Sequence, residues 1–210
     1  MAVRTARSFG KRVNVHARSI ESIQNSLLAG VDMIYHAEYS DEKTLDMLEE
    51  ARDRIFVAPA ISLFHTMLHE AEPFGLPRTV VEGMGVPALI EESVKTHTEL
   101  RKRGIRHLIG GDYGFTWNMN GANARDIKHF VDYYGYAPAE ALVCATRNGG
   151  LAMRDQGDLG TLQEGMLADM LLVDGDPLKD LTILTDKNRL ALIMKDGEIH
   201  SQSPSLRHVT

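Results

Sequence analysis

The stretches Val13-Asn14-Val15-His16, Met33-Ile34-Tyr35-His36 and Leu108-Ile109-Gly110-Gly111-Asp112 decide the fold of this chain. Each stretch leads a short apolar run into a side chain that can bind a metal ion. In a closed parallel barrel the carboxyl ends of all strands face one mouth. Two imidazoles and a carboxylate at three such ends can therefore converge on one cation, which predicts a metal-dependent enzyme site.

The composition is that of an ordinary globular protein. The chain has 210 residues, 43% of them hydrophobic, and a formal net charge of -6 from 23 basic and 29 acidic residues. Because these charges form no long run of either sign, nucleic acid is not an expected partner. The sequence has no stretch of about 20 apolar residues and no signal-peptide core, so we expect a cytoplasmic protein that does not enter membranes. The single Cys144 excludes an intrachain disulfide and is expected to serve in packing.

Short strands alternate with helices through the first part of the chain. Strands are expected at residues 12–15, 31–35, 55–58 and 106–109, and helices at residues 2–9, 19–28, 41–51 and 88–103. Ser19 and Ser40 are the expected N-caps of two helices, and Gly30 and Gly104 follow the ends of two helices. Such alternation favours a parallel sheet with its helices outside, and four strand–helix units make half of a (β/α)8 barrel.

The rest of the chain divides into a loop, two helices and a β region. Residues 59–87 contain four prolines and three glycines without sustained periodicity, which predicts a long loop above the barrel mouth. Helices are expected near residues 122–134 and 138–146, strands at 168–173 and 190–194, and a turn at 174–177. We therefore expect a barrel segment at 1–155, a small sheet at 156–200 and a frayed tail at 201–210.

The order and spacing of several motifs resemble the C-terminal half of the amidohydrolase superfamily, in particular its imidazolonepropionase-like and prolidase-like branch. The matching pieces are Val15-His16-Ala17, Tyr35-His36-Ala37-Glu38, Gly110-Gly111-Asp112, Pro138-Ala139-Glu140-Ala141-Leu142, and Gly165 to Met170 leading into Val173 to Pro177. The resemblance covers nearly the whole chain. It implies an α/β fold made of strands five to eight of a (β/α)8 TIM-type barrel with their helices, followed by the C-terminal strands of a small β-sandwich.

The resemblance also implies a metal site and a reaction. In that family the strand-five and strand-six histidines bind one metal, which His16 and His36 match. The strand-eight aspartate, which Asp112 matches, binds the other metal and moves protons. The expected cofactor is a divalent metal, most often zinc, with one or two ions in the complete enzyme. Metal-activated water would then hydrolyse a carbon–nitrogen bond of an amide or a dipeptide-like substrate, with Asp112 as general base and acid.

The same family uses a His-x-His pair on its first strand and a lysine, often carboxylated, on its fourth. This sequence contains no His-x-His. We therefore expect the N-terminal half of the barrel to lie outside this chain. The rival expectation is an inactive half-barrel that associates with itself or with a complementary N-terminal half, since open strand edges favour association. Independently of this rival, the alternative for His16 and His36 is that of structural, hydrogen-bonded residues.

Four residues near the expected mouth are predicted to contact a small-molecule substrate: Arg18, His65, Tyr113 and Trp117. A guanidinium at a strand end can pair with a substrate carboxylate, although a solvated loop charge is the alternative for Arg18. His65 and His69 have helical spacing, but the metalloprotease motif needs a glutamate where Thr66 stands. They are therefore expected to contact substrate or to be exposed. Tyr113 and Trp117 either wall a substrate pocket or cover the barrel rim.

Overall fold

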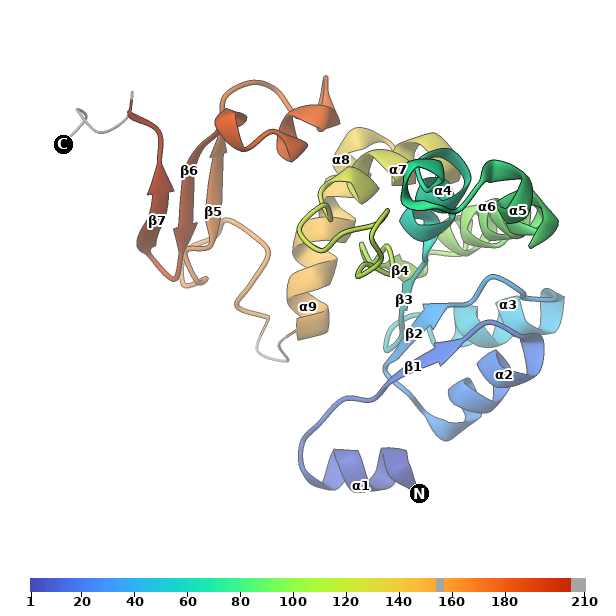
Figure 1. Cartoon of the computed structure of the whole chain (residues 1–210). Coiled ribbons are helices and arrows are strands. Elements are labelled where there is room, and N and C mark those ends of the chain that lie inside the picture. The colour runs from blue at the N-terminus through green and yellow to red at the C-terminus, as the bar shows by residue number, and fades with distance from the viewer. Residues whose placement is uncertain (154–156, 205–210) are drawn as a thin grey trace.

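A four-stranded parallel sheet forms the centre of the molecule (Figure 1). The computed structural model describes residues 1–153 and 157–204. The strands follow in the order β1 (Asn14–Ala17), β2 (Met33–His36), β3 (Phe56–Ala58) and β4 (Arg106–His107). Each strand pairs in parallel with the next one along the chain, so all carboxyl ends lie at one edge of the sheet. The predicted parallel sheet of successive strand–helix units is confirmed.

Helices connect and cover these strands. They are α1 (Ala2–Ser8), α2 (Ile20–Ala29), α3 (Glu42–Glu50), α4 (Ile61–His69), α5 (Arg78–Gly83), α6 (Val86–Lys102), α7 (Arg125–Tyr134), α8 (Pro138–Val143) and α9 (Gly149–Met153). Shorter helical segments are η1 (Glu72–Phe74), the π-helical η2 (Cys144–Asn148), η3 (Leu181–Thr185) and η4 (Lys187–Arg189). Ser19 caps α2 as predicted by accepting a bond from the Ser22 amide, and Gly30 ends that helix at a φ of 79°.

The predicted cap of α3 is wrong by one residue. The Asp41 carboxylate accepts bonds from the Thr44 amide at 2.9 Å and from the Thr44 hydroxyl at 2.6 Å. The Ser40 hydroxyl instead donates to the Ala37 carbonyl at 3.1 Å. Both residue types can cap a helix, and the carboxylate accepts two bonds at once, which favours Asp41.

The long loop predicted at residues 59–87 is also wrong, because this segment contains α4, η1, α5 and the start of α6. The buried residues of α4 are Ile61, Ser62, Leu63, Phe64 and Thr66. The prolines and glycines that suggested a loop stand instead at helix boundaries: Gly75 ends η1, Pro77 precedes α5, and Pro87 lies in the first turn of α6, where proline is tolerated. The Thr66 hydroxyl donates to the Ser62 carbonyl at 2.9 Å, which satisfies this polar group inside the helix.

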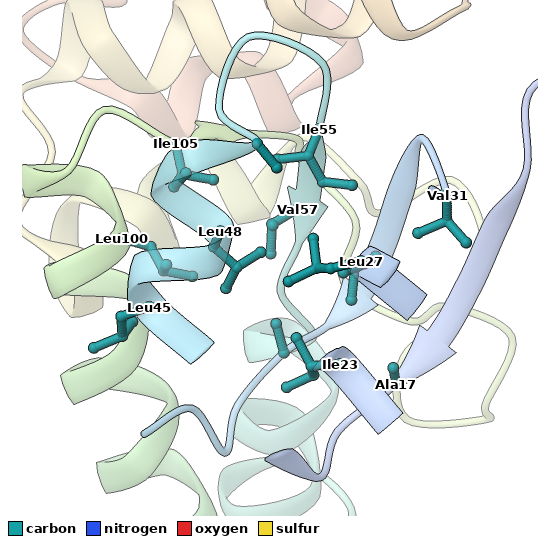
Figure 2. Close-up of a cluster of buried hydrophobic side chains, with 13 residues drawn as sticks. Ala17, Ile23, Leu27, Val31, Leu45, Leu48, Ile55, Val57, Leu100 and Ile105 are labelled. Atoms are coloured by element: carbon teal, nitrogen blue, oxygen red, sulfur yellow. The ribbon is translucent and has the colours of Figure 1, made fainter. Parts of the chain in front are cut away.

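One face of the sheet packs against α2, α3 and α6 to form a continuous apolar core (Figure 2). The side chains that meet there include Ile23, Leu27, Leu45, Leu48, Val57, Leu100 and Ile105. Leu48 and Val57 are completely buried, which places α3 directly on β3. This core fixes the helices behind the sheet and leaves the carboxyl edge of the strands free to carry polar groups.

A second, antiparallel sheet follows, made of β5 (Met170–Val173), β6 (Leu190–Lys195) and β7 (Glu198–Gln202). It lies beside the helical layer (Figure 1). The hairpin turn between β6 and β7 consists of Asp196 and Gly197, with φ of 50° and 79°, the two positive values that a type I′ turn requires. The small predicted sheet is confirmed, but the predicted frayed tail is wrong at its start because Ser201 and Gln202 belong to β7. Residues 205–210 of that tail and the predicted boundary at 155 lie outside the described residues.

Among the described residues, no helix combines the length and the apolar character needed to cross a bilayer.

A buried pair of histidines joins α6, β4 and the segment between α7 and α8. His97 Nδ1 lies 3.1 Å from His107 Nε2, and His107 Nδ1 lies 2.7 Å from the Tyr136 hydroxyl. Both imidazoles are completely buried. Burial lowers the pKa of His107 to about 3, so this imidazole is neutral in the folded protein.

The apolar core behind the sheet predicts how two leucine substitutions change the stability of the protein. Leu48→Ala should lower the free energy of unfolding by about 2–5 kcal/mol, because it leaves a cavity among side chains that cannot close it. Leu28→Ala is the matched control, because Leu28 on α2 is 77% exposed. Its effect should stay within about 0.5 kcal/mol. Chemical denaturation measures both, and similar losses in the two variants would contradict the proposed core.

The buried imidazoles predict an acid-sensitive fold. The pKa of His107 is about 3 when folded and near its ordinary value of 6.5 when unfolded. Its stabilising contribution is therefore fully present above pH 6.5 and is lost as the pH falls toward 3. Between about pH 7 and pH 5 the native protein should lose about 1–2 kcal/mol more stability than His107→Gln. Denaturant titrations of both proteins at the two pH values measure this difference. An equal loss of stability in the native protein and in His107→Gln would contradict the prediction.

Candidate active site

Three side chains meet at the carboxyl edge of the parallel sheet. His16 belongs to β1, His36 ends β2, and Asp112 follows β4 after Gly111. The imidazole centroids of His16 and His36 lie 4.4 Å apart, with the rings edge to face. The Nε2 atom of His36 lies 4.0 Å from Oδ2 of Asp112. The structure thus brings together the three residues that the sequence singled out as metal ligands.

A break in regular strand geometry makes this meeting possible. In the register of β1 and β2, His16 lies opposite Tyr35 and Ala17 lies opposite His36. Since side chains alternate across a strand, regular geometry would place the two imidazoles on opposite faces. The backbone leaves the extended conformation at this point, with φ of 92° at His36 and 61° at Ala37. Such values cost about 1–3 kcal/mol in residues other than glycine and persist where the surroundings enforce them.

A side chain of α6 holds the strained segment after β2. The buried Thr96 hydroxyl donates to the Glu38 carbonyl at 2.7 Å. This bond ties the backbone that follows His36 to the rigid helix behind the sheet. It explains how the positive φ values are retained, and it depends on a residue 58 positions away from Glu38 in the sequence.

Asp112 is placed by a similar departure from extended backbone, with a φ of 54°. The preceding Gly111 packs so tightly that a Cβ atom there would lie 2.3 Å from Oδ2 of Asp126 and 2.5 Å from Cβ of Ser62. Only glycine allows this close approach. The Gly-Gly-Asp order in the sequence therefore has a steric reason as well as a conformational one.

Glu38 is a functional candidate that the sequence interpretation did not assign. Its side chain is completely buried, with Oε1 3.6 Å from Nη1 of Arg18 and 4.0 Å from Nδ1 of His36. Among the described residues, no hydrogen-bond partner reaches either Glu38 oxygen or Nδ1 of His36. Burial raises the pKa of Glu38 to about 7, although the Arg18 charge opposes this. A charged residue two positions beyond His36 in Tyr35-His36-Ala37-Glu38 was the available signal.

Arg18 lies between two carboxylates. Its Nη1 atom contacts Glu38, and its Nη2 atom lies 4.0 Å from Oδ2 of Asp112. The guanidinium also lies over the Phe64 ring, with 5.0 Å from Cζ to the ring centroid. Arg18 is thus packed into the site, and the alternative of a solvated loop charge does not describe it.

The other predicted substrate residues are bound to protein partners. Nδ1 of His65 lies 2.6 Å from the Tyr133 hydroxyl, and its Nε2 atom lies 3.5 Å from Glu70. The Tyr113 hydroxyl donates to the buried Asp126 at 2.7 Å. The Trp117 ring is stacked on Phe115 at 5.6 Å between centroids. These contacts place Tyr113 beside the Asp112 strand end and His65 on α4, and the substrate role of all three stays a prediction.

A hollow of about 410 Å³ opens on the sheet face opposite the main core. Its lining includes Asn14, Met33, Tyr35, Leu108 and Cys144. Burial raises the pKa of the Cys144 thiol to about 11, so the thiolate is scarce at neutral pH. This agrees with the packing role predicted for Cys144 and removes it from the nucleophile candidates.

The donor atoms at the strand ends are of types that bind metal ions. Burial, with Arg18 and His16 adding to the effect, lowers the pKa of His36 to about 3, so the imidazole is neutral and keeps a lone pair for a ligand. The buried Nδ1 atom of His36 has no hydrogen-bond partner among the described residues and faces Glu38 at 4.0 Å. Within residues 1–153 and 157–204, however, no three His, Cys, Asp or Glu side chains are grouped closely enough to hold a metal ion. The donor types therefore fit a metal ion, whereas these residues by themselves supply only part of the ligand set.

Comparison with known proteins identifies a family and several relatives. The profile of the Amidohydrolase family matches residues 1–200. Ochratoxinase of Aspergillus niger is 24% identical over 188 residues, which are 89% of this chain and 37% of that protein. Imidazolonepropionase of Pyrobaculum arsenaticum is 30% identical over 101 residues, which are 48% of this chain and 25% of that protein. The chain thus spans well under half the length of these curated relatives.

Solved structures share the fold. The crystal structure of A. niger ochratoxinase matches with a TM-score of 0.82 at 23% identity, covering 96% of this chain and 44% of that one. A Xaa-Pro dipeptidase with bound methionine matches with a TM-score of 0.78 at 24% identity, covering 95% and 47%. A prolidase complexed with N-methylphosphonate-L-proline matches with a TM-score of 0.81 at 22% identity, covering 96% and 48%. The parallel and antiparallel sheets together correspond to about half of such a protein.

The bond between Thr96 and the Glu38 backbone can be tested by stability. Thr96→Val keeps the shape of the side chain and removes the donor, which leaves a buried carbonyl without its partner. The free energy of unfolding should fall by about 1–2 kcal/mol. The matched control is Thr98→Val, at a half-buried position of the same helix. A loss no larger than that of the control would show that Thr96 does not hold the strained segment.

Proposed function

Because this chain belongs to the amidohydrolase family, we propose that it carries part of the catalytic site of a metal-dependent hydrolase that cleaves a carbon–nitrogen bond. The meeting of His16, His36 and Asp112 at one edge of a parallel sheet is the observation that carries the proposal. In this proposal β1 to β4 are strands five to eight of a TIM-type barrel. The sheet β5 to β7 is part of a small β-sandwich, and the proposed boundary between the two parts in the sequence is at residue 155.

The chemistry divides between the three residues. His16 and His36 would supply imidazole nitrogens to a divalent metal, and zinc is an ion that suits nitrogen and carboxylate donors. When bound, such an ion lowers the pKa of its water toward neutrality and polarises the substrate carbonyl. Asp112 accepts the proton of the attacking water and returns it to the leaving nitrogen, as a general base and then a general acid. Further ligands would complete the set from a complementary N-terminal half.

The proposed substrate is a small amide or a dipeptide-like molecule. Solved structures that share the fold hold N-methylphosphonate-L-proline, a derivative of proline, and the free amino acid methionine. Arg18 is the cation beside Asp112, and a guanidinium binds a carboxylate through two parallel hydrogen bonds. We propose that Arg18 binds the substrate carboxylate and that His65, Tyr113 and Trp117 shape the surrounding wall. The predicted cytoplasmic location stays a prediction.

A second candidate is association without turnover. The described parallel sheet ends at β1 on one side and at β4 on the other. Edge strands carry unpaired backbone groups that favour pairing with another chain. The partner would be a second copy of this chain or a complementary barrel half. This candidate shares the fold with the first one and differs in having no catalytic activity of its own.

Turnover separates the two candidates. The purified chain, mixed with a complementary N-terminal half and zinc, should hydrolyse a Xaa-Pro dipeptide or an acyl-anilide, and Asp112→Asn should lower kcat by at least about a hundredfold because the proton acceptor is lost. The variant should keep the far-ultraviolet circular dichroism of the native protein. Sedimentation of the same sample reports association. Oligomers with neither zinc binding nor hydrolysis would favour the second candidate, and unchanged turnover in Asp112→Asn would remove Asp112 from the mechanism.

A further inference from the structure

Asn118 makes an unusual set of contacts behind Asp112. Its side chain is completely buried, and its Nδ2 atom donates to the Gly111 carbonyl at 2.8 Å and to the Asp112 carbonyl at 3.1 Å. Its Oδ1 atom accepts a bond from the Ser62 hydroxyl at 3.1 Å. Both amide hydrogens and one acceptor position are therefore used. The Ser62 bond also fixes the orientation of the amide, because the reversed amide would place an oxygen against two carbonyls.

Two successive carbonyls that face one donor require a curled backbone. In an extended strand successive carbonyls point in opposite directions, so one amide group cannot reach both. At Asp112 the chain curls, with a φ of 54°, and the carbonyls of Gly111 and Asp112 face the same side. The two bonds from Asn118 are therefore available in the left-handed conformation of Asp112 and not in the extended one, and they stabilise the first against the second.

A short turn returns Asn118 to the strand end. The Gly114 amide donates to the Asn118 carbonyl and the Asn118 amide donates to the Phe115 carbonyl, both at 2.9 Å. This turn closes the segment after Asp112 on itself. Asn118 thus has its backbone fixed by the turn and its side chain fixed by Ser62 of α4, so it forms a rigid support for the strand end.

The position of the Asp112 carboxylate depends on that backbone conformation. Its Oδ2 atom lies 4.0 Å from Nε2 of His36 and 4.0 Å from Nη2 of Arg18. Rotation about φ changes the direction of the Cα–Cβ bond, so an extended Asp112 would direct its carboxylate away from these partners. We infer that Asn118 is a positioning residue that holds the Asp112 carboxylate toward His36, a role that rests on the proposed catalytic function of Asp112.

The test compares three single substitutions in the full chain. Asn118→Asp keeps the size of the side chain, removes both donated hydrogens and places a carboxylate oxygen against two carbonyls. Ser62→Ala keeps Asn118 but removes the bond that orients its amide. Ser93→Ala is the matched control, because it removes another buried hydroxyl bond, 3.0 Å to the Tyr134 hydroxyl, away from Asp112.

Hydrogen exchange gives a readout that does not depend on activity. In Asn118→Asp, amides of residues 110–119 should exchange at least about tenfold faster, because the loss of buried hydrogen bonds makes local opening easier. Residues 33–38 should be unchanged. Ser62→Ala should show the same pattern to a smaller degree, which keeps the test available if Asn118→Asp does not fold. Unchanged exchange at residues 110–119 in a folded variant would overturn the inference. An increase that is uniform along the chain and no different from that in the Ser93→Ala control would also overturn it.

Kinetics gives the second readout. With zinc and a Xaa-Pro dipeptide, Asn118→Asp should lower kcat at least about tenfold and leave KM within about twofold, because proton transfer is affected more than substrate binding. A kcat equal to that of the native protein would overturn the inference. If the native chain, supplied with zinc and a complementary N-terminal half, shows no hydrolysis, the proposed function fails, whereas local exchange at residues 110–119 still decides whether Asn118 holds Asp112 in place.

Discussion

The curled backbone at the carboxyl ends of the strands is the constraint on which the site depends. Regular strands would direct His16 and His36 to opposite faces of the sheet, and an extended Asp112 would not keep its present direction. Positive φ values at His36, Ala37 and Asp112 bring the three side chains to one place. Each strained segment is tied to a rigid element by a buried polar side chain, Thr96 for the first and Asn118 for the second. The arrangement of these three side chains therefore depends on the packed helices behind the sheet.

Burial sets the charge state of the site. His36 is kept neutral, as a metal ligand must be, while Glu38 is buried beside it with a pKa of about 7. Arg18 is the cation that lies between Glu38 and Asp112, and its stacking over Phe64 limits its freedom. Glu38 and Nδ1 of His36 lie 4.0 Å apart without a hydrogen bond, so the buried carboxyl group faces the ring and does not hold it.

The relatives that share this scaffold carry names of different enzymes, among them ochratoxinase, imidazolonepropionase and prolidase. A common barrel edge with different surrounding segments is the usual way in which one fold supports several substrates. The region between β3 and β4 in this chain is helical rather than a loop, and it contributes Ser62 and Phe64, which contact Asn118 and Arg18.

The sequence alone determined the parallel sheet, most helix positions, the small antiparallel sheet and the three strand-end residues, because apolar periodicity, caps and motif order are local properties. It did not determine the helical nature of residues 59–87, since prolines and glycines mark the boundaries of short helices as readily as they mark a loop. The contacts of Thr96 and Asn118 were likewise invisible, because each depends on partners that are distant along the chain or on a local φ that no residue type enforces. Only the tertiary structure decided that His36 and Asp112 leave the extended conformation, since packing against α4 and α6 stabilises backbone geometry that isolated strands would avoid.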